Sequence, residues 1–261
     1  MCSTATLALP ETLSPRRTSG EHLFLWVSHM TRKTSARLAG FTFLFYIGVA
    51  FASIVLFNRA TDAEGTAAKL ARIAQHASDV RLSVLLSLLC CFSAVVLAVA
   101  LYGITRDEDH ELALLALLCR VGEGLCIATF SVATMGLLRL ATATGASAAD
   151  AAATNALGEL LLEVNNGGGS VSAILFSVGS TLFAWLLLRG RMVPVLLAWL
   201  GVFASLLLVV LVPAQFAGYL HGAVLSYIWI PALVFEVTLA LWLLIKGVAL
   251  PETRYSLGAA T

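Results

Sequence analysis

The chain has 261 residues, of which 59% are hydrophobic and only 12% are charged, and its mean hydropathy is +0.92. A soluble domain carries roughly 25% charged residues, so this composition argues against a water-soluble protein and predicts one embedded in a membrane. The net charge of +1 leaves no basic surplus for binding nucleic acid.

Residues 1–29 contain two prolines, the pair Arg16-Arg17 and one short apolar patch, Leu23–Val27. The patch is shorter than the core of a signal peptide, so no basic region here is followed by a long enough apolar core. We predict that residues 1–29 are disordered or that translation begins at Met30, whose basic neighbours are typical of a helix entering a membrane from the cytoplasm.

The rest of the chain, residues 30–250, contains six long apolar runs and ends in a tail, residues 251–261, that we expect to be flexible. About 20 mainly apolar residues cross a bilayer as a helix, and no run alternates as a membrane β-strand would. The sequence therefore predicts an all-α, polytopic transmembrane bundle of six spans: Leu38–Phe57, Leu82–Ile104, Leu112–Leu138, Val171–Leu188, Val193–Pro213 and Ala223–Ile245.

Basic residues gather on the cytoplasmic side of membrane proteins. A cytoplasmic N-terminus puts ten of them inside: Arg16, Arg17, Arg32, Lys33, Arg37, Arg106, Arg189, Arg191, Lys246 and Arg254. Five fall outside: Arg59, Lys69, Arg72, Arg81 and Arg139. Trp185 and Trp242 lie near inner ends and Trp229 near an outer end, as expected for aromatic side chains at headgroup depth. With six spans, both termini are cytoplasmic.

Two outer segments are longer than plain turns. In Asn58–Arg81, helical spacing predicts a short amphipathic helix that packs on the bundle through an apolar stripe: Ala67, Leu70, Ala71, Ala74 and Ala77. In Arg139–Ser170, a leucine-rich helix is predicted to cap the outer face and to end at a flexible break formed by Asn165-Asn166-Gly167-Gly168-Gly169.

Three ionisable residues lie inside apolar runs, where each charge costs roughly 2.5–3.5 kcal/mol. Arg120 and Glu123 are in the third run and Glu236 is in the sixth. At 1.5 Å of rise per residue, they lie about 12, 16 and 13 Å from the cytoplasmic end, and Tyr46 of the first run is also about 12 Å deep. Ser180 and Thr181 of the fourth run fall close to the same depth. The sequence thus predicts a polar layer inside the bundle.

The charges in this layer do not balance, because one cation faces two carboxylates. Arg120 and Glu123 are three residues apart and can pair within one helix, and Arg120 can also form a bidentate pair with Glu236 across helices. Either one carboxyl group is protonated or a bound cation supplies the missing charge. This imbalance is the strongest functional indication in the chain.

Two features favour a cavity near the charges. Gly122 and Gly124 flank Glu123 and leave space around it, and Pro231 is expected to kink the sixth span five residues before Glu236. The alternative is structural, because buried ion pairs can fix helix register and small residues permit close helix packing.

No cofactor and no metal site are implied. The cysteines lack C-x-x-C spacing and are expected to pack as small apolar side chains, and His221 has no second histidine at ligand spacing. Three functions remain open: binding or passing a small ligand, lipid or proton at Arg120, Glu123, Glu236 and Tyr46; a structural or partner-regulating subunit; and an intramembrane enzyme, for which no nucleophile with a His partner is found.

Four stretches resemble a bacterial multi-pass membrane family catalogued as domain of unknown function 4386: Arg32–Gly40 (RKTSARLAG), Ala113–Glu123 (ALLALLCRVGE), Leu187–Gly201 (LLRGRMVPVLLAWLG) and Ile230–Val248 (IPALVFEVTLALWLLIKGV). The resemblance implies six helices in the bacterial cytoplasmic membrane and a homologous region that begins near Met30. It brings no biochemical activity.

Overall fold

The computed structural model describes residues 32–143, 148–220 and 227–249. The predictions for residues 1–29 and 251–261, for the start at Met30, for His221 and for the first residues of the sixth span lie outside these ranges. Within them the chain is entirely helical. The seven helices are α2 (Arg32–Thr61), α3 (Thr66–Gln75), α4 (Ala77–Thr105), α5 (His110–Thr142), α6 (Ala148–Arg189), α7 (Val195–Phe216) and α9 (Ile230–Ile245).

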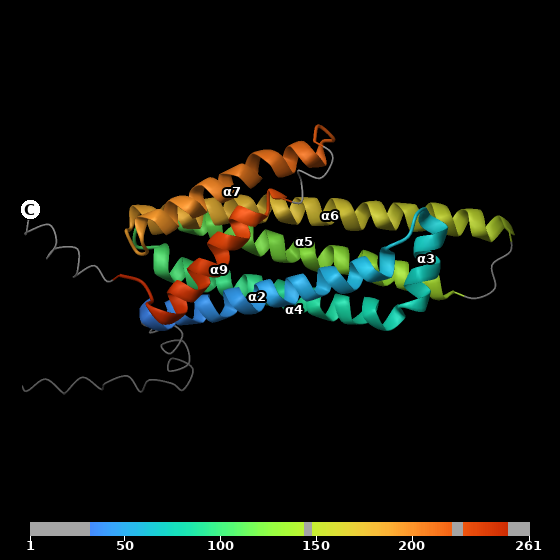
Figure 1. Cartoon of the computed structure of the whole chain (residues 1–261), viewed down its shortest axis with the longest axis horizontal. Coiled ribbons are helices and arrows are strands. Elements are labelled where there is room, and N and C mark those ends of the chain that lie inside the picture. Colours follow the sequence, from blue (N-terminus) through green and yellow to red (C-terminus); the bar gives the residue numbers. More distant parts are fainter. Residues whose placement is uncertain (1–31, 144–147, 221–226, 250–261) are drawn as a thin grey trace, which may run out of the picture. The chain divides into compact units, whose positions relative to one another are not determined.

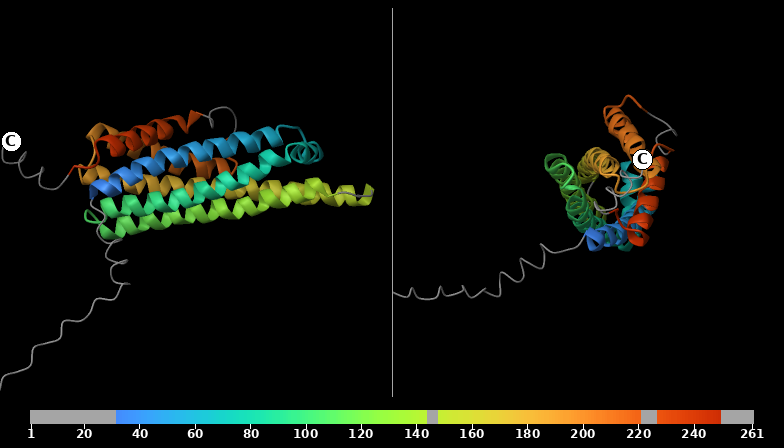
Figure 2. Two further views of the ribbon diagram at one scale, coloured as in Figure 1. Left: turned by 90° about the horizontal axis from the view of Figure 1, so that it is seen from below. Right: turned by 90° about the vertical axis from the view of Figure 1, so that its left-hand side faces the viewer.

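Four long helices, α2, α4, α5 and α6, run side by side, and Figures 1 and 2 show this from three directions. Helix α7 packs on α6, and α9 packs on α2 and α7. The largest buried cluster joins α2, α4, α6, α7 and α9 around side chains such as Phe43, Leu97, Phe183, Phe235 and Leu243. The predicted all-α bundle is confirmed.

Five of the described helices, α2, α4, α5, α6 and α7, are long and apolar enough to cross a membrane, and α9 is a shorter apolar helix of 16 residues. Large apolar side chains remain exposed along them, including Phe51, Phe92, Val132, Leu196 and Phe203. A soluble protein rarely exposes so much contiguous apolar surface. The chain is therefore a membrane-embedded helical protein.

Hydroxyl side chains inside these helices bond to the carbonyl four residues earlier. Thr105 donates to Leu101, Ser131 to Ile127 and Thr238 to Val234, at 2.9, 2.8 and 2.7 Å. A hydroxyl group in hydrocarbon is costly unless it finds such a partner. These residues thus stay compatible with an apolar span and need not mark a functional site.

The first connecting segment forms the predicted short helix, α3, and it packs on the bundle. Its buried side chains are Leu70 and Ile73, which join Val80 and Leu137 in a second apolar cluster. Ala67 and Ala71 of the predicted stripe are instead exposed. The predicted stripe is therefore correct at Leu70 and at Ala77, which packs against this cluster, and wrong at Ala67 and Ala71. The large apolar residues, rather than the alanines, determine which face of the helix is buried.

The predicted break at Asn165–Gly169 is wrong, because α6 continues through these residues to Arg189. The amide nitrogen of Asn165 donates to the Thr134 hydroxyl of α5 at 2.7 Å. A Cβ atom on Gly168 would lie 3.0 Å from Cβ of Phe130. The glycine thus lets α5 and α6 approach closely, and packing outweighs the low helix propensity of the Asn-Gly run.

Glycine also permits the contact between α2 and α9. A Cβ atom on Gly40 would lie 2.6 Å from the carbonyl oxygen of Ala240 and 2.7 Å from the backbone nitrogen of Leu244. Gly48, two turns further along α2, has nothing within 4 Å of such an atom. Within one helix, Gly40 thus has no space for a larger side chain, whereas Gly48 does.

We predict that Gly40→Ala destabilises the protein by about 1–3 kcal/mol, as expected for overpacking. Gly48→Ala should be neutral or stabilising by up to about 1 kcal/mol, because alanine is the better helix former. Thermal unfolding of the detergent-solubilised variants, followed by circular dichroism, measures both. Equal midpoints for the two variants would contradict the close contact between α2 and α9.

Candidate functional site

The predicted polar layer is formed where α2, α5, α6 and α9 meet. Helix α5 contributes Arg120 and Glu123, α2 contributes Tyr46, and α9 contributes Glu236. The side chains of Arg120 and Glu123 are 2% and 1% exposed, and Glu236 is 6% exposed. Three ionisable groups are therefore buried among apolar helices.

Arg120 and Glu123 form the predicted ion pair within α5. Nη1 of Arg120 lies 2.8 Å from Oε2 of Glu123. The other carboxylate oxygen, Oε1, accepts a hydrogen bond of 2.6 Å from the Tyr46 hydroxyl. Glu123 therefore has one partner on its own helix and one on α2, which connects the charged pair to the neighbouring helix.

Two aromatic rings flank the Arg120 guanidinium group. Its Cζ atom lies 5.2 Å from the centroid of the Tyr46 ring and 4.9 Å from that of the Phe176 ring on α6. Both distances fit cation–π contacts, which stabilise a desolvated cation by about 2 kcal/mol or more. The cation is therefore held by one carboxylate and by two rings from separate helices.

The predicted bidentate pair between Arg120 and Glu236 does not form: within the described ranges, Arg120 makes its ion pair with Glu123. The i, i+3 spacing on α5 brings Glu123 closer than a residue on another helix. Glu236 still interacts electrostatically with both residues. Its Oε1 atom is buried and has no hydrogen-bond partner among the described residues. One oxygen of the second carboxyl group is thus buried near the ion pair without a partner among the described residues.

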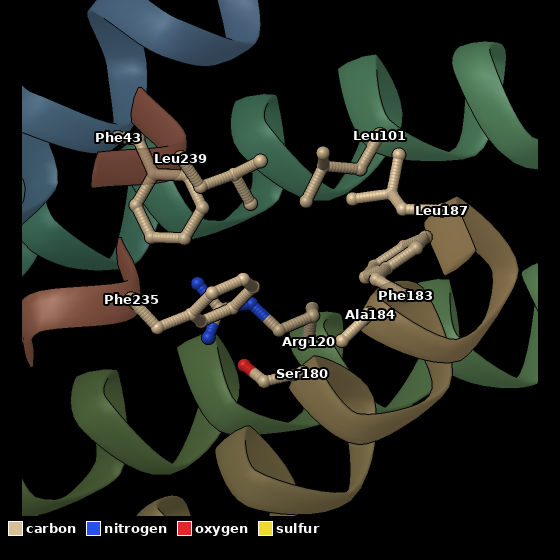
Figure 3. Close-up of a pocket in the computed structure, with 9 residues that line it drawn as sticks. All are labelled: Phe43, Leu101, Arg120, Ser180, Phe183, Ala184, Leu187, Phe235 and Leu239. Carbon is tan, nitrogen blue, oxygen red and sulfur yellow. The ribbon is translucent and has the colours of Figure 1, made fainter. Parts of the chain in front are cut away.

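A small cavity adjoins the Arg120 side chain (Figure 3). Its volume is about 10 Å³. Besides Arg120, the one polar residue of the described ranges that lines it is Ser180, and the other walls are apolar: Phe43, Leu101, Phe183, Ala184, Leu187, Phe235 and Leu239. A cavity of about 10–15 Å³ holds one water molecule. The space beside the cation therefore admits a water-sized species and excludes an organic ligand.

The residues expected to open space act differently. A Cβ atom on Gly124 would lie 3.3 Å from the Cys91 carbonyl oxygen of α4, and one on Gly122 would lie 3.2 Å from the Leu175 side chain of α6. Both glycines therefore permit close helix packing. Pro231 lies in the first turn of α9, which begins at Ile230, where the missing N–H leaves no helical hydrogen bond unmade. The kink predicted there stays a prediction, because most of the residues of the sixth span that precede Pro231 lie outside the described ranges.

Three contributors were not predicted: Phe176, Gly179 and Ser172, all on α6. A Cβ atom on Gly179 would lie 3.1 Å from Cγ of Arg120, so this glycine leaves space for the arginine side chain. The Ser172 hydroxyl donates to the Glu123 carbonyl at 3.4 Å. Depth in the membrane indicated Ser180 and Thr181. Gly179 precedes Ser180 by one residue and Phe176 precedes it by about one helical turn. Which of these side chains faces Arg120 depends on the rotation of α6 about its axis.

No metal site is formed by the residues that the structure describes: no group of three or more His, Cys, Asp or Glu side chains gathers among them. The cysteines in these ranges, Cys90, Cys91, Cys119 and Cys126, are free, and Cys90 is buried beside the charged cluster. The chemistry available to the cluster is therefore that of carboxyl, guanidinium, phenol and thiol groups.

Fold and site together define a polytopic helical membrane protein with a charged cluster buried between its helices. The model of one protein family, described as domain of unknown function DUF4386, matches residues 38–247, and the chain belongs to this family. Neither the curated proteins nor the solved structures contain a match.

We predict that Glu123→Gln destabilises the protein by about 3–5 kcal/mol, because it leaves the buried Arg120 cation without its carboxylate. Tyr46→Phe should cost less, about 1.5–3 kcal/mol, for one hydrogen bond to a charged group. The exposed Glu163→Gln is the control and should stay within about 0.5 kcal/mol of the wild type. Chemical or thermal unfolding in detergent gives the three values, and equal effects of E123Q and E163Q would contradict a stabilising pair.

Proposed function

We propose that this protein binds or passes a proton, or a ligand no larger than water, at an intramembrane site formed by Arg120, Glu123, Glu236 and Tyr46. One observation carries the proposal: the buried Oε1 of Glu236 has no partner in the described structure, while the nearby cation already pairs with Glu123. A second unpaired negative charge at this depth is costly, so a proton on Glu236 balances the cluster.

The size of the cavity narrows the ligand classes that the sequence left open. A volume of about 10 Å³ accommodates a single water molecule but neither a lipid headgroup nor a metabolite. A proton carried by Glu236, with water in the adjoining cavity, fits this volume. Lipid and larger ligands are therefore disfavoured at the cluster itself.

A structural subunit is the second candidate function, and the packing of the cluster favours it. Arg120 contacts Glu123, Tyr46 and Phe176, so its position connects α2, α5 and α6, and other helices fill the space beside the neighbouring glycines. In this role the charges only maintain helix register. An intramembrane enzyme would need a water path to both carboxyl groups, and no observation favours one.

We also propose the bacterial cytoplasmic membrane as its location, with both termini in the cytoplasm and α9 completing a sixth span. The support is the distribution of basic residues. Among the described residues, one end holds seven basic residues: Arg32, Lys33, Arg37, Arg106, Arg189, Arg191 and Lys246. The opposite end, where α3 lies, holds five.

Infrared spectroscopy of the protein in lipid bilayers tests the proton on Glu236. A protonated buried carboxyl group gives a C=O stretching band distinct from that of a carboxylate. We expect this band at neutral pH in the wild type, its loss in Glu236→Gln, and its retention in the exposed control Glu163→Gln. Because glutamine imitates the neutral acid, E236Q should fold as well as the wild type, with a stability change below about 1.5 kcal/mol.

Native mass spectrometry of wild type and E236Q provides the second arm, since it detects any bound small cation or ligand. A protonated Glu236, or a species bound only to the wild type, supports the site. The proposal is overturned if the wild type shows neither a protonated Glu236 nor a bound species and E236Q gives a lower folding yield. The structural role would then be the remaining explanation.

A further inference from the structure

A separate groove opens at the end of the bundle where α6 turns into α7 and α9 ends. Its volume is about 370 Å³, and its lining includes Arg191, Pro194, Trp242, Lys246 and Ala249. The backbone nitrogen of Ala249 donates to the Met192 carbonyl at 3.1 Å, which joins the two segments that form its walls. This volume falls within the range of roughly 300–1,000 Å³ typical of ligand sites.

Two cations line this groove without a carboxylate partner. Arg191 and Lys246 are both exposed, and neither forms an ion pair with a described residue. The neighbouring Arg189 differs, since its Nη1 lies 3.1 Å from Oδ2 of Asp109. Glu108 contacts Gly190 on the α5 side of the turn but does not line the groove. The groove is therefore positively charged.

Arg191 adopts a backbone conformation that arginine rarely takes. Its φ angle is +44°, and among the described residues no other residue except glycine has a positive φ angle. It follows the end of α6, where the Arg191 and Met192 nitrogens bond to the carbonyls of Leu188 and Leu187. Glycine or asparagine usually occupies this position. An arginine held here has a strained backbone that places its charge at the groove.

Interaction with helix ends is the competing explanation for these cations, because α6 and α9 both end here and a helix C-terminus favours positive charge. Some of the last carbonyls, however, already accept hydrogen bonds: Leu187 and Leu188 from the turn, and Trp242 from both Lys246 and Gly247. A helix-end role also does not require a groove between the two cations.

Exposed apolar side chains belong to the two helix ends that form the groove. Leu196, in the first turn of α7, is 84% exposed, and Ile245, which precedes Lys246, is 70% exposed. Trp242 lines the groove together with the cations, and tryptophan is typical of the membrane interface. A ligand with an anionic head and apolar chains matches this combination of groups, whereas a free soluble anion uses only the cations.

We propose that this groove binds the phosphate headgroup of an anionic membrane lipid, with Arg191 and Lys246 contacting the phosphate and the acyl chains lying along Leu196 and Ile245. Basic pockets at the ends of transmembrane helices bind such headgroups through the same chemistry. The site is separate from the buried cluster, so its failure would leave the proposal for Glu236 unaffected.

Native mass spectrometry of the full chain, with phosphatidylglycerol or phosphatidylcholine added in detergent, tests the site. We expect one retained phosphatidylglycerol, bound more tightly than phosphatidylcholine, and a loss of about 30-fold in apparent affinity for Arg191→Asn/Lys246→Gln. Asparagine is chosen because it tolerates positive φ. Inorganic phosphate is added in a third arm.

The matched control is Lys69→Gln/Arg139→Gln, which removes two cations at the opposite end and should retain the lipid. The charge-conserving Lys246→Arg should also retain it. The single variants R191N and K246Q give intermediate losses if the double variant fails to fold. Equal retention of phosphatidylglycerol by wild type and the charge-removing variants, no preference over phosphatidylcholine, or displacement of the lipid by inorganic phosphate would overturn the assignment.

Discussion

The packing of this bundle depends on one constraint: the Arg120 cation lies in a low-dielectric interior and must be compensated there. Glu123 supplies the charge at 2.8 Å, Tyr46 holds the carboxylate from α2, and Phe176 covers the guanidinium group from α6. Each contact comes from a different helix. The requirements of one side chain therefore constrain the relative positions of α2, α5 and α6, because a buried charge tolerates little displacement of its partners.

Glu236 is the exception to this compensation. Its helix, α9, packs closely against α2 at Gly40 and against α7 at Gly201, where the Phe235 ring occupies the position that a Cβ atom would take. Close packing of the α9 backbone, and not pairing with a charged side chain, therefore positions the Glu236 carboxyl group in the cluster. A buried carboxyl oxygen with no partner among the described residues is what the proposed proton site requires, and it is energetically costly for a purely structural residue.

The sequence predicted the elements well because apolar runs and buried charges are strong, local signals. The helix class, the short helix after the first span, the Arg120–Glu123 pair and the depth of Tyr46 all follow from spacing and helical rise. Its errors have a common origin in contacts between helices. Asn165–Gly169 suggested a break, yet Phe130 and Thr134 on α5 support a continuous helix there. Phe176 and Gly179 were missed because the rotation of α6 about its axis is set by packing.

The length of α6 has a mechanical consequence. Its 42 residues span about 60 Å, twice the roughly 30 Å of a hydrocarbon core. About a quarter of the way along, Gly158 contacts Leu70 of α3; about three quarters of the way along, Gly179 lies against the Arg120 side chain; and the helix ends just before Arg191. One uninterrupted ladder of backbone hydrogen bonds thus joins both surfaces of the membrane. A shift of α6 along its axis displaces the surroundings of Arg120 and the groove at Arg191 together, so the two sites are not mechanically independent.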